Sequence, residues 1–428
     1  MRNRSLSTMQ GFTQRGFRYL PDLACDPKRT KYACRRAAMI LAIVALGVTF
    51  LVPRTALPQS TGDTPVEIDP AAGTMPELGP EIEPGDGTAR RTGRSVTPLV
   101  APVPFKNTQL GWGLMLMGGL IHRFDADTSI KPSTGVVGAF YTENGSWGVM
   151  AMENARLAGD RWRLRLMVGH PEVRYDYYGI GEDAGNAGRS VEIQQNMNLA
   201  TVAALGRVAN NVYLGGTALY LGASTAVRDT AGLGLPPAAA DISDMQLFAV
   251  GLQGEADTRN DDYWPTHGTL ARLKAWFFVD ALGGERSFQR YVLFWSWYAP
   301  VRGERLVLAT NLNASGASDD APFWALPAVG FGRGGLRGYT QGRYRDAVMT
   351  TEQAELRYHS AGRFGATVFV GFGHVAPTFG DIFKAQVLPA GGLGLRYQLT
   401  QKFPMHMRFD YSWGRDGSLF YFGVSEAF

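Results

Sequence analysis

Cysteine is nearly absent from this 428-residue chain, and both of its cysteines, Cys25 and Cys34, lie close to the start. The remaining residues therefore cannot form a disulfide scaffold or a cysteine-ligated metal site. Charged residues are also scarce, at 19% of the chain, and the net charge is only +4. Because nucleic-acid-binding proteins cluster basic residues on one face, this composition gives no reason to expect nucleic acid as a partner.

Histidine is scarce as well, and its placement argues against an active site. The six histidines are scattered along the chain: His122, His170, His267, His359, His374 and His406. No Gly-x-Ser-x-Gly sequence is present to carry a nucleophilic serine, and no histidine pair has metal-binding spacing. We therefore expect no catalytic residue, no metal site and no cofactor, and we predict that the protein is not an enzyme.

Only one long apolar run is present, residues 37–52 (AAMILAIVALGVTFLV). It is shorter than the roughly 20 residues that a membrane-spanning helix needs. A basic region followed by a short apolar core is typical of an export signal, so residues 1–57 are predicted to be a signal-like leader. An uncleaved anchor or a buried helix is the alternative, and Met39 is an alternative translation start.

The next segment, residues 58–97, is rich in proline, glycine and acidic residues. It has few large apolar side chains to bury, so we predict a disordered acidic linker and no folded domain there. The folded part of the chain is accordingly expected at residues 98–428.

Glycine (53 residues) and aromatic residues (11%) are abundant, which favours sheets with many tight turns over long helices. From Gly111 onward, apolar and polar residues alternate with a period of two, which is typical of β-strands. For example, Phe409 and Tyr411 alternate with Arg408 and Asp410. About fifteen strands of this kind can be counted.

These strands favour a closed transmembrane barrel over a soluble all-β sandwich, which remains the alternative. Strands of roughly 10 residues with aromatic residues at their ends suit a tilted membrane-spanning strand. No helical segment is available to cover the edges of a large open sheet, whereas closure removes the edges and pairs every backbone group. We therefore predict an all-β fold, a transmembrane antiparallel β-barrel with an N-terminal signal and disordered extension.

A glycine- and arginine-rich stretch, residues 330–346 (GFGRGGLRGYTQGRYRD), interrupts the strand pattern. Within it, Leu-Arg-Gly-Tyr resembles the Val-Arg-Gly-Phe/Tyr motif of the BamA/TamA (bacterial surface antigen) superfamily of outer-membrane barrels. The run Tyr177–Gly181 (YYGIG) is similar to a sequence in the first half of such barrels. The motif residues that carry the resemblance are Leu336, Arg337, Gly338, Tyr339, Arg343, Arg345 and Asp346.

The resemblance implies a barrel of 16 strands, with the motif in the sixth extracellular loop, folded back into the lumen. It also implies five strands after the motif and eleven before it. Five can be counted after it, but only about ten before it. We expect the missing strand within Arg161–Gly181, because that run is too long for one transmembrane strand.

The resemblance further implies a buried ion pair between Arg337 and acidic residues on the barrel wall. Glu355 lies on the polar face of the next strand with Arg357, and a carboxylate there suits a guanidinium partner. On the following strand, Gly371 occupies the position where the family usually has an acid. One acceptor is therefore expected to be missing, so that Arg337 depends on Glu355 alone or on backbone carbonyls.

The last residues, 419–428 (LFYFGVSEAF), are expected to form one final strand. A terminal phenylalanine on such a strand resembles the signal by which the bacterial assembly machinery recognises outer-membrane barrels. The residues expected to carry this signal are Tyr421, Gly423 and Phe428. The expected partners are that machinery and the outer-membrane lipids, phospholipid and lipopolysaccharide.

Family members with periplasmic POTRA domains insert or export proteins, with a mechanism thought to use a weak seam between the first and last strands. By analogy, the resemblance implies a bacterial outer-membrane protein with a role in protein assembly or translocation. Because the linker 58–97 stands where POTRA domains would receive a client, a periplasmic partner is expected to supply a client-binding domain.

A passive, anion-preferring channel for small solutes is the alternative function. Basic residues expected in the lumen outnumber acidic ones: Arg161, Arg163, Arg165, Arg272, Lys274, Arg290, Arg305, Arg396 and Arg408, against Glu255, Asp257, Glu355 and Asp410. An open lumen with this excess would prefer anions. Steady conductance is not expected if these charges pair and the inserted loop fills the lumen.

Overall fold

The computed structural model describes residues 97–124, 132–228, 241–261, 264–360, 362–398 and 406–428. The predicted leader 1–57, with its apolar core 37–52, and the linker up to residue 96 lie outside these ranges. Within the described ranges, no helix is long and apolar enough to cross a membrane.

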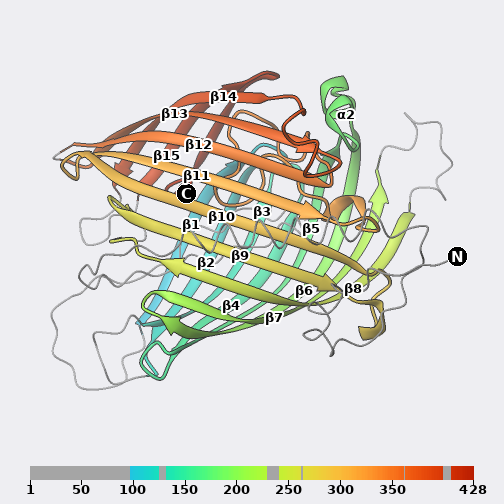
Figure 1. Cartoon of the computed structure of the whole chain (residues 1–428), viewed down its shortest axis with the longest axis horizontal. Helices are drawn as coiled ribbons and strands as arrows, with labels where there is room; N and C mark the ends of the chain where they lie inside the picture. Colours follow the sequence, from blue (N-terminus) through green and yellow to red (C-terminus); the bar gives the residue numbers. More distant parts are fainter. Residues whose placement is uncertain (1–96, 125–131, 229–240, 262–263, 361, 399–405) are drawn as a thin grey trace, which may run out of the picture. The chain divides into compact units, whose positions relative to one another are not determined.

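Sixteen antiparallel strands form a closed barrel, in which each strand pairs with the next in sequence and β16 pairs with β1 (Figure 1). The strands are β1 (Thr97–Asn107), β2 (Gly111–His122), β3 (Ser133–Thr142), β4 (Trp147–Leu157), β5 (Trp162–Tyr177), β6 (Val191–Ala209), β7 (Val212–Val227), β8 (Asp241–Asp257), β9 (Gly268–Phe278), β10 (Phe288–Arg302), β11 (Leu306–Ala317), β12 (Val348–His359), β13 (Phe364–Ala376), β14 (Leu388–Gln398), β15 (His406–Gly414) and β16 (Gly417–Val424). Short helical segments lie in the connections: α2 (Glu182–Ala187), η3 (Asp280–Leu282) and η4 (Phe323–Ala325). The predicted transmembrane barrel of 16 strands is confirmed.

The expectation of two strands between Arg161 and Gly181 is wrong. β5 is a single strand of 16 residues, followed directly by α2. The strand missing from the sequence-based count is β1, which pairs with β2 along its whole length. Its prolines, Pro98, Pro102 and Pro104, lack the N–H group that a ladder needs and therefore obscured it in the sequence.

Side chains alternate between the outer and inner faces of the wall along each strand. On β13, Val368, Val370 and Phe372 are exposed on the outer face, whereas Thr367 and Phe369 are buried on the inner face. Exposed aromatic side chains such as Trp112, Tyr141 and Trp147 lie close to strand ends on the outer face. This apolar outer surface is the surface that lipid covers.

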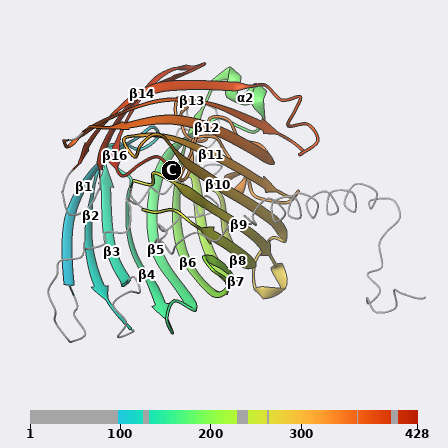
Figure 2. The ribbon, with the colours of Figure 1, turned by 60° about the vertical axis from the view of Figure 1, so that its left-hand side comes forward.

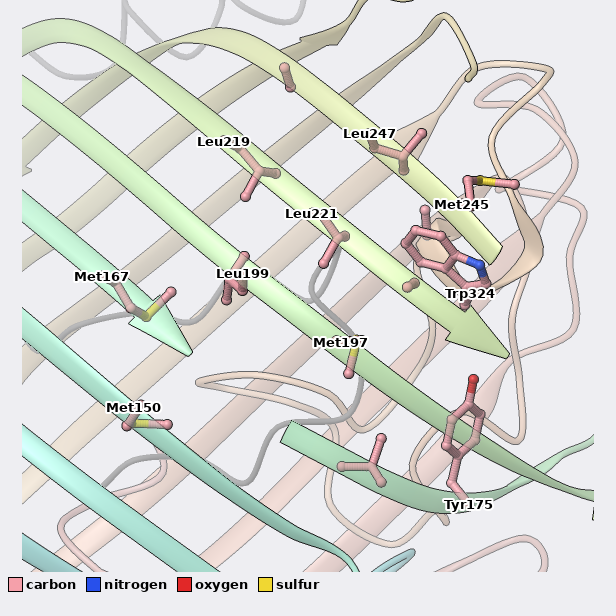
Figure 3. Close-up of a cluster of buried hydrophobic side chains, with 14 of the residues drawn as sticks. Met150, Met167, Tyr175, Met197, Leu199, Leu219, Leu221, Met245, Leu247 and Trp324 are labelled. Atoms are coloured by element: carbon pink, nitrogen blue, oxygen red, sulfur yellow. The ribbon is translucent and has the colours of Figure 1, made fainter. Parts of the chain in front are cut away.

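The inner face has two different walls. In Figure 2, β1 to β7 form the lower part of the barrel and β12 to β14 the upper part. Much of the inner face of β2 to β8 is apolar, and Figure 3 shows methionines and leucines from neighbouring strands on it. Its buried methionines are Met115, Met117, Met150, Met152, Met167, Met197 and Met245. β5, β8 and β9 also carry buried charges there, among them Arg163, Glu255 and Arg272. The expectation of a polar lumen is therefore correct for the strands that carry the motif loop's partners and for the buried charges of β5, β8 and β9, but not for the apolar part of the inner face.

Val370 lies at the middle of β13 with its side chain 55% exposed on the outer face. We predict that Val370→Arg lowers the free energy of unfolding by about 2–4 kcal/mol, because a cation there is placed in the lipid midplane. Urea titration of the protein in phospholipid vesicles, followed by tryptophan fluorescence, measures this change. Val387→Arg, in the connection before β14, is the control; equal stability of both variants would contradict the lipid-facing assignment.

Candidate functional site

The connection between β11 and β12, residues 318–347, carries the glycine- and arginine-rich motif and is called the motif loop below. It is the sixth connection at its end of the barrel, as the family resemblance implied. Its tip enters the lumen, where Leu336, Arg337 and Tyr339 are buried. The predicted insertion of Arg337 into the lumen is confirmed in the structure.

Arg337 binds two carboxylates, and the expectation that it depends on Glu355 alone or on backbone carbonyls is wrong. It pairs with Glu355 on β12, as predicted, and its Nη1 donates to Asp410 on β15 over 2.7 Å. Its guanidinium carbon lies 3.6 Å from the centre of the Phe369 ring on β13, within cation–π range. The arginine is therefore held from three strands, and the second acid lies two strands beyond the expected position.

Gly371 has a packing role in place of the missing acid. A Cβ atom at Gly371 would lie 2.8 Å from Cδ1 of Leu336, and one at Gly373 would lie 2.8 Å from its Cδ2. The two glycines therefore leave room on the wall for the first residue of the motif. An acid at Gly371 would occupy the space that Leu336 needs, because interiors are close-packed.

Six buried charges, Arg337 among them, form a closed ring of alternating sign. Its members in order are Arg337, Glu355, Arg357, Glu426, Arg396 and Asp410. The N–O distances from Glu355 to Arg357, Glu426 to Arg396 and Arg396 to Asp410 are 2.6, 2.8 and 2.6 Å. The link between Arg357 and Glu426 is longer, at 4.0 Å. Each charge has opposite charges on both sides, which offsets the cost of burying it.

Gly338 fixes the turn that follows Arg337. Its φ of +105° is rare for other residues, and a Cβ atom there would lie 3.0 Å from the carbonyl oxygen of Trp413. The Gly338 N–H donates to the Tyr421 hydroxyl over 3.0 Å, and the Tyr339 hydroxyl donates to the carbonyl of Pro389 over 2.8 Å. The motif loop thus contacts β14, β15 and β16 at this turn.

The second half of the motif binds the connections at the same end of the barrel. Arg343 pairs with Asp416 over 3.1 Å and donates to the Gly185 carbonyl in α2 over 3.0 Å. The Tyr344 hydroxyl donates to Asp416 over 2.9 Å. Burial, together with this hydrogen bond, raises the pKa of Tyr344 to about 12. Tyr344 therefore stays protonated, and remains a donor, over the whole physiological pH range.

Arg345 and Asp346 lie at the end of the motif loop, just before β12 begins. The Nη1 group of Arg345 donates to the Phe323 carbonyl in η4 over 2.7 Å, and its main-chain oxygen accepts from Gly181 over 2.7 Å. Asp346 accepts from the N–H of Ala347 over 2.7 Å. The Tyr177–Gly181 run that resembled the family thus lies beside the motif in space.

The predicted signal residues at the end of the sequence do not share one strand. Tyr421 and Gly423 belong to β16, but this strand ends at Val424. Phe428 is fully buried inside the barrel. The expectation that residues 419–428 form one strand is wrong, because Ser425 adopts a φ of +81° and turns the chain off the wall.

Most of the lumenal arginines counted from the sequence are paired. Arg163, Arg165 and Arg272 surround Glu255, with N–O distances of 2.9, 2.8 and 3.3 Å. Arg161 and Arg305 were wrongly placed in the lumen, since both are exposed in turns. These pairings offset part of the positive charge that an anion-preferring lumen would present.

Among the described residues, no group of three histidine, cysteine or acidic side chains is placed to hold a metal ion. His359 and His406 do approach each other, with ring centres 5.3 Å apart, and both contact Trp264 from the β8–β9 connection. The contact is aromatic packing between rings from β12, β15 and the β8–β9 connection.

Three site residues were not assigned from the sequence. The sequence places Asp410 on the lumen face, but nothing in its own strand indicates that it meets Arg337. The sequence also predicts a lumenal Arg396, whereas it predicts that Glu426 belongs to the final strand. The ring could not be predicted from the sequence, because it depends on the curvature of the barrel wall, which brings side chains of β12, β14 and β15 close to Arg337.

We predict that Arg337→Ala weakens the barrel by about 3–5 kcal/mol, because it leaves two buried carboxylates short of a partner. The barrel should lose its heat-resistant, compact mobility in gel electrophoresis at a lower temperature than wild type. Arg415→Ala, which removes an exposed arginine from the β15–β16 turn, is the control. Heat resistance and abundance equal to wild type would contradict a structural role of Arg337.

The substitution Gly371→Asp distinguishes two hypotheses: that this position must stay small so that Leu336 can pack, or that it only lacks an acid that Arg337 could bind. We expect it to destabilise the barrel by about 1–3 kcal/mol, because the new side chain meets Leu336 and Gln353. Gly380→Ala is the control, since its Cβ would have no neighbour closer than 3.7 Å. Urea unfolding in vesicles measures both, and a gain in stability for Gly371→Asp would show that the position accepts a second acid.

Comparison with known proteins shows which family the chain resembles and which solved structures share its fold. Residues 153–428 match the Omp85 superfamily domain. No curated protein sequence matches the chain. Similar solved structures are BamA from Haemophilus ducreyi lacking POTRA domains 1–3 (TM-score 0.54, 16% identity, 78% of this chain and 70% of that one) and CdiB from Escherichia coli (TM-score 0.53, 12% identity, 83% and 68%). CdiB from Acinetobacter baumannii is also similar (TM-score 0.51, 13% identity, 77% and 59%).

At these identities the solved structures establish a shared barrel fold and no shared activity. The domain match, however, covers well over half of the chain and contains the motif loop, its wall partners and β16. Sequence motif, strand order and inserted loop agree with it. The chain belongs to the Omp85 superfamily.

Proposed function

We propose that this protein inserts polypeptides into, or translocates them across, a bacterial outer membrane, and that the junction of β1 and β16 opens during this process. The observation that carries the proposal is the pairing at this junction, called the seam below. β1 and β16 share a single registered pair, Lys106 with Phe422. β15 and β16, by contrast, pair from Met407–Val424 to Gly414–Gly417.

The sequence of β1 explains the weak seam. Successive N–H groups of a strand point to opposite neighbours, and Pro98, Pro102 and Pro104 all occupy even positions. Because β1 pairs with β2 along its whole length, we infer that the missing N–H groups lie on the side of β16. The edge of β1 therefore offers few donors to β16, and it is available to another strand.

Aromatic side chains hold the seam where backbone pairs are lacking. Trp112 of β2 lies 6.4 Å from Phe420 and 6.0 Å from Phe422 of β16, measured between ring centres. The Lys106 ammonium lies 5.3 Å from the Trp112 ring. Side-chain contacts of this kind can be broken and re-formed without unpairing a long ladder, which suits a junction that opens.

The membrane location and the partners belong to the same proposal. The apolar outer surface suits a lipid environment, and the family relationship supports the bacterial outer membrane as its setting. Because the segment before β1 is predicted to be an acidic linker, we propose that a separate periplasmic protein presents the polypeptide. The paired charges of the lumen and the inserted motif loop support this function over a passive anion channel.

A disulfide across the seam tests the proposal. Lys106→Cys with Phe422→Cys, in a chain whose Cys25 and Cys34 are replaced by serine, should cross-link the two strands. Vesicles containing the protein should accelerate the membrane insertion of a urea-unfolded barrel protein, and the disulfide should abolish the acceleration until a reductant is added. Insertion is measured as heat-modifiable mobility of the added barrel.

The matched control links a complete pair of strands on the outer face, Leu116→Cys with Ala139→Cys, in the same cysteine-free background. This disulfide should leave the acceleration unchanged in both oxidised and reduced states. Equal activity of the oxidised and reduced seam variants would exclude opening of the seam from the mechanism.

A further inference from the structure

The residues after β16, Ser425–Phe428, leave the barrel wall and enter the lumen; they are called the tail segment below. Ser425 makes the turn with a φ of +81°, a conformation that strains a residue other than glycine. The Ser425 N–H donates to the His406 carbonyl over 2.7 Å, which is its last contact with β15. Beyond this point the tail segment has no strand partner.

The tail segment ends among buried side chains on the opposite wall of the barrel, which are called the pocket below. Phe428 is fully buried, and β12 to β15 separate β16 from the strands that line this pocket. The lining residues come from β9, β10 and β11: Leu270, Phe294, Tyr298, Val307 and Ala309. Arg357 lies 4.9 Å from the Phe428 ring centre and donates to the Phe428 main-chain oxygen over 3.1 Å. The pocket therefore binds both an aromatic ring and a main-chain oxygen.

Two further contacts join the tail segment to the motif loop. Glu426 pairs with Arg396 over 2.8 Å and so supplies one carboxylate of the charge ring around Arg337. The Ala427 carbonyl accepts from the Gly334 N–H over 2.8 Å, three residues before Arg337. Displacing the tail segment would remove the hydrogen bond to Gly334 and one carboxylate of the ring that holds Arg337.

The way in which the tail segment is held resembles the binding of a ligand more than the pairing of a strand. Its contacts are one aromatic anchor, one carboxylate that pairs with two arginines and isolated hydrogen bonds to main-chain atoms, without a β-ladder. The strain at Ser425 opposes the bound position. Contacts of this type can dissociate as a unit while the barrel wall stays paired.

We propose that the pocket on β9–β11 is a peptide-binding site for a phenylalanine side chain that follows a carboxylate by two residues, and that the tail segment occupies it as an intramolecular ligand. Occupancy of the site holds the motif loop in place and keeps the lumen closed. The inference concerns the resting barrel, and it does not depend on insertion or translocation activity.

The first test removes the ligand side chains. Glu426→Ala with Phe428→Ala should give a severalfold increase in open time in planar bilayers and severalfold faster protease cleavage of the motif loop. The matched control is Phe383→Ala, because Phe383 is 94% exposed in the β13–β14 connection and fills no pocket. Conductance and cleavage equal to wild type would overturn the proposal.

The second test returns the ligand as a free peptide. The peptide Ser-Glu-Ala-Phe should close the double variant in a saturable manner, whereas Ser-Glu-Ala-Ala should have no effect. Equal effects of the two peptides, or none from either, would contradict a specific site.

A third variant covers the case in which the double variant fails to fold. Ala309 is fully buried in the pocket, so Ala309→Phe should fill the pocket from the wall and expel Phe428. Hydrogen exchange should then accelerate severalfold in residues 425–428 and near Gly334, with the strands unchanged. Continued protection of residues 425–428 would show that the tail segment does not depend on this pocket.

Discussion

The neutral ring of six buried charges around Arg337 is the interaction on which the interior of this barrel depends. Its members come from the motif loop, from β12, β14 and β15, and from the tail segment, so no single element can form it alone. Removing one member leaves a neighbouring charge short of its partner in a region that water does not reach freely. The loop, the wall and the tail segment are therefore expected to order together, as parts of one cooperative structure.

The ring also explains why glycine is required where the motif approaches the wall. An arginine can bind carboxylates on two strands only if the loop backbone comes very close to them. Gly338 allows this through its positive φ, and Gly371 and Gly373 allow it by leaving space for Leu336. The absence of an acid at Gly371 is thus compensated by Asp410, and the same anchoring is obtained from a different strand.

Much of the fold follows from the sequence, because a period of two places each side chain on the lipid or lumen face without knowledge of the neighbours. The same alternation placed Glu355 correctly on the lumen face, and the family resemblance implied its pairing with Arg337. β1 was hidden by prolines that make it a poor partner for β16. The choice of Asp410 and the inward turn at Ser425 could not be predicted: the first depends on barrel curvature, and the second on a strained conformation that leaves no sequence signal.

The two inner walls have different consequences for motion. The charged wall is joined to the motif loop and the tail segment by directional contacts, so movement there must break ion pairs. Much of the inner face of β2 to β8 is lined by methionine and leucine, whose contacts are non-directional and adapt to small shifts. The ion pairs there join β5, β8 and β9 through Glu255. β1 lies between this adaptable wall and the single-pair seam. If the barrel opens, β1 and β2 are therefore the strands expected to move, while β12 to β15 stay in place.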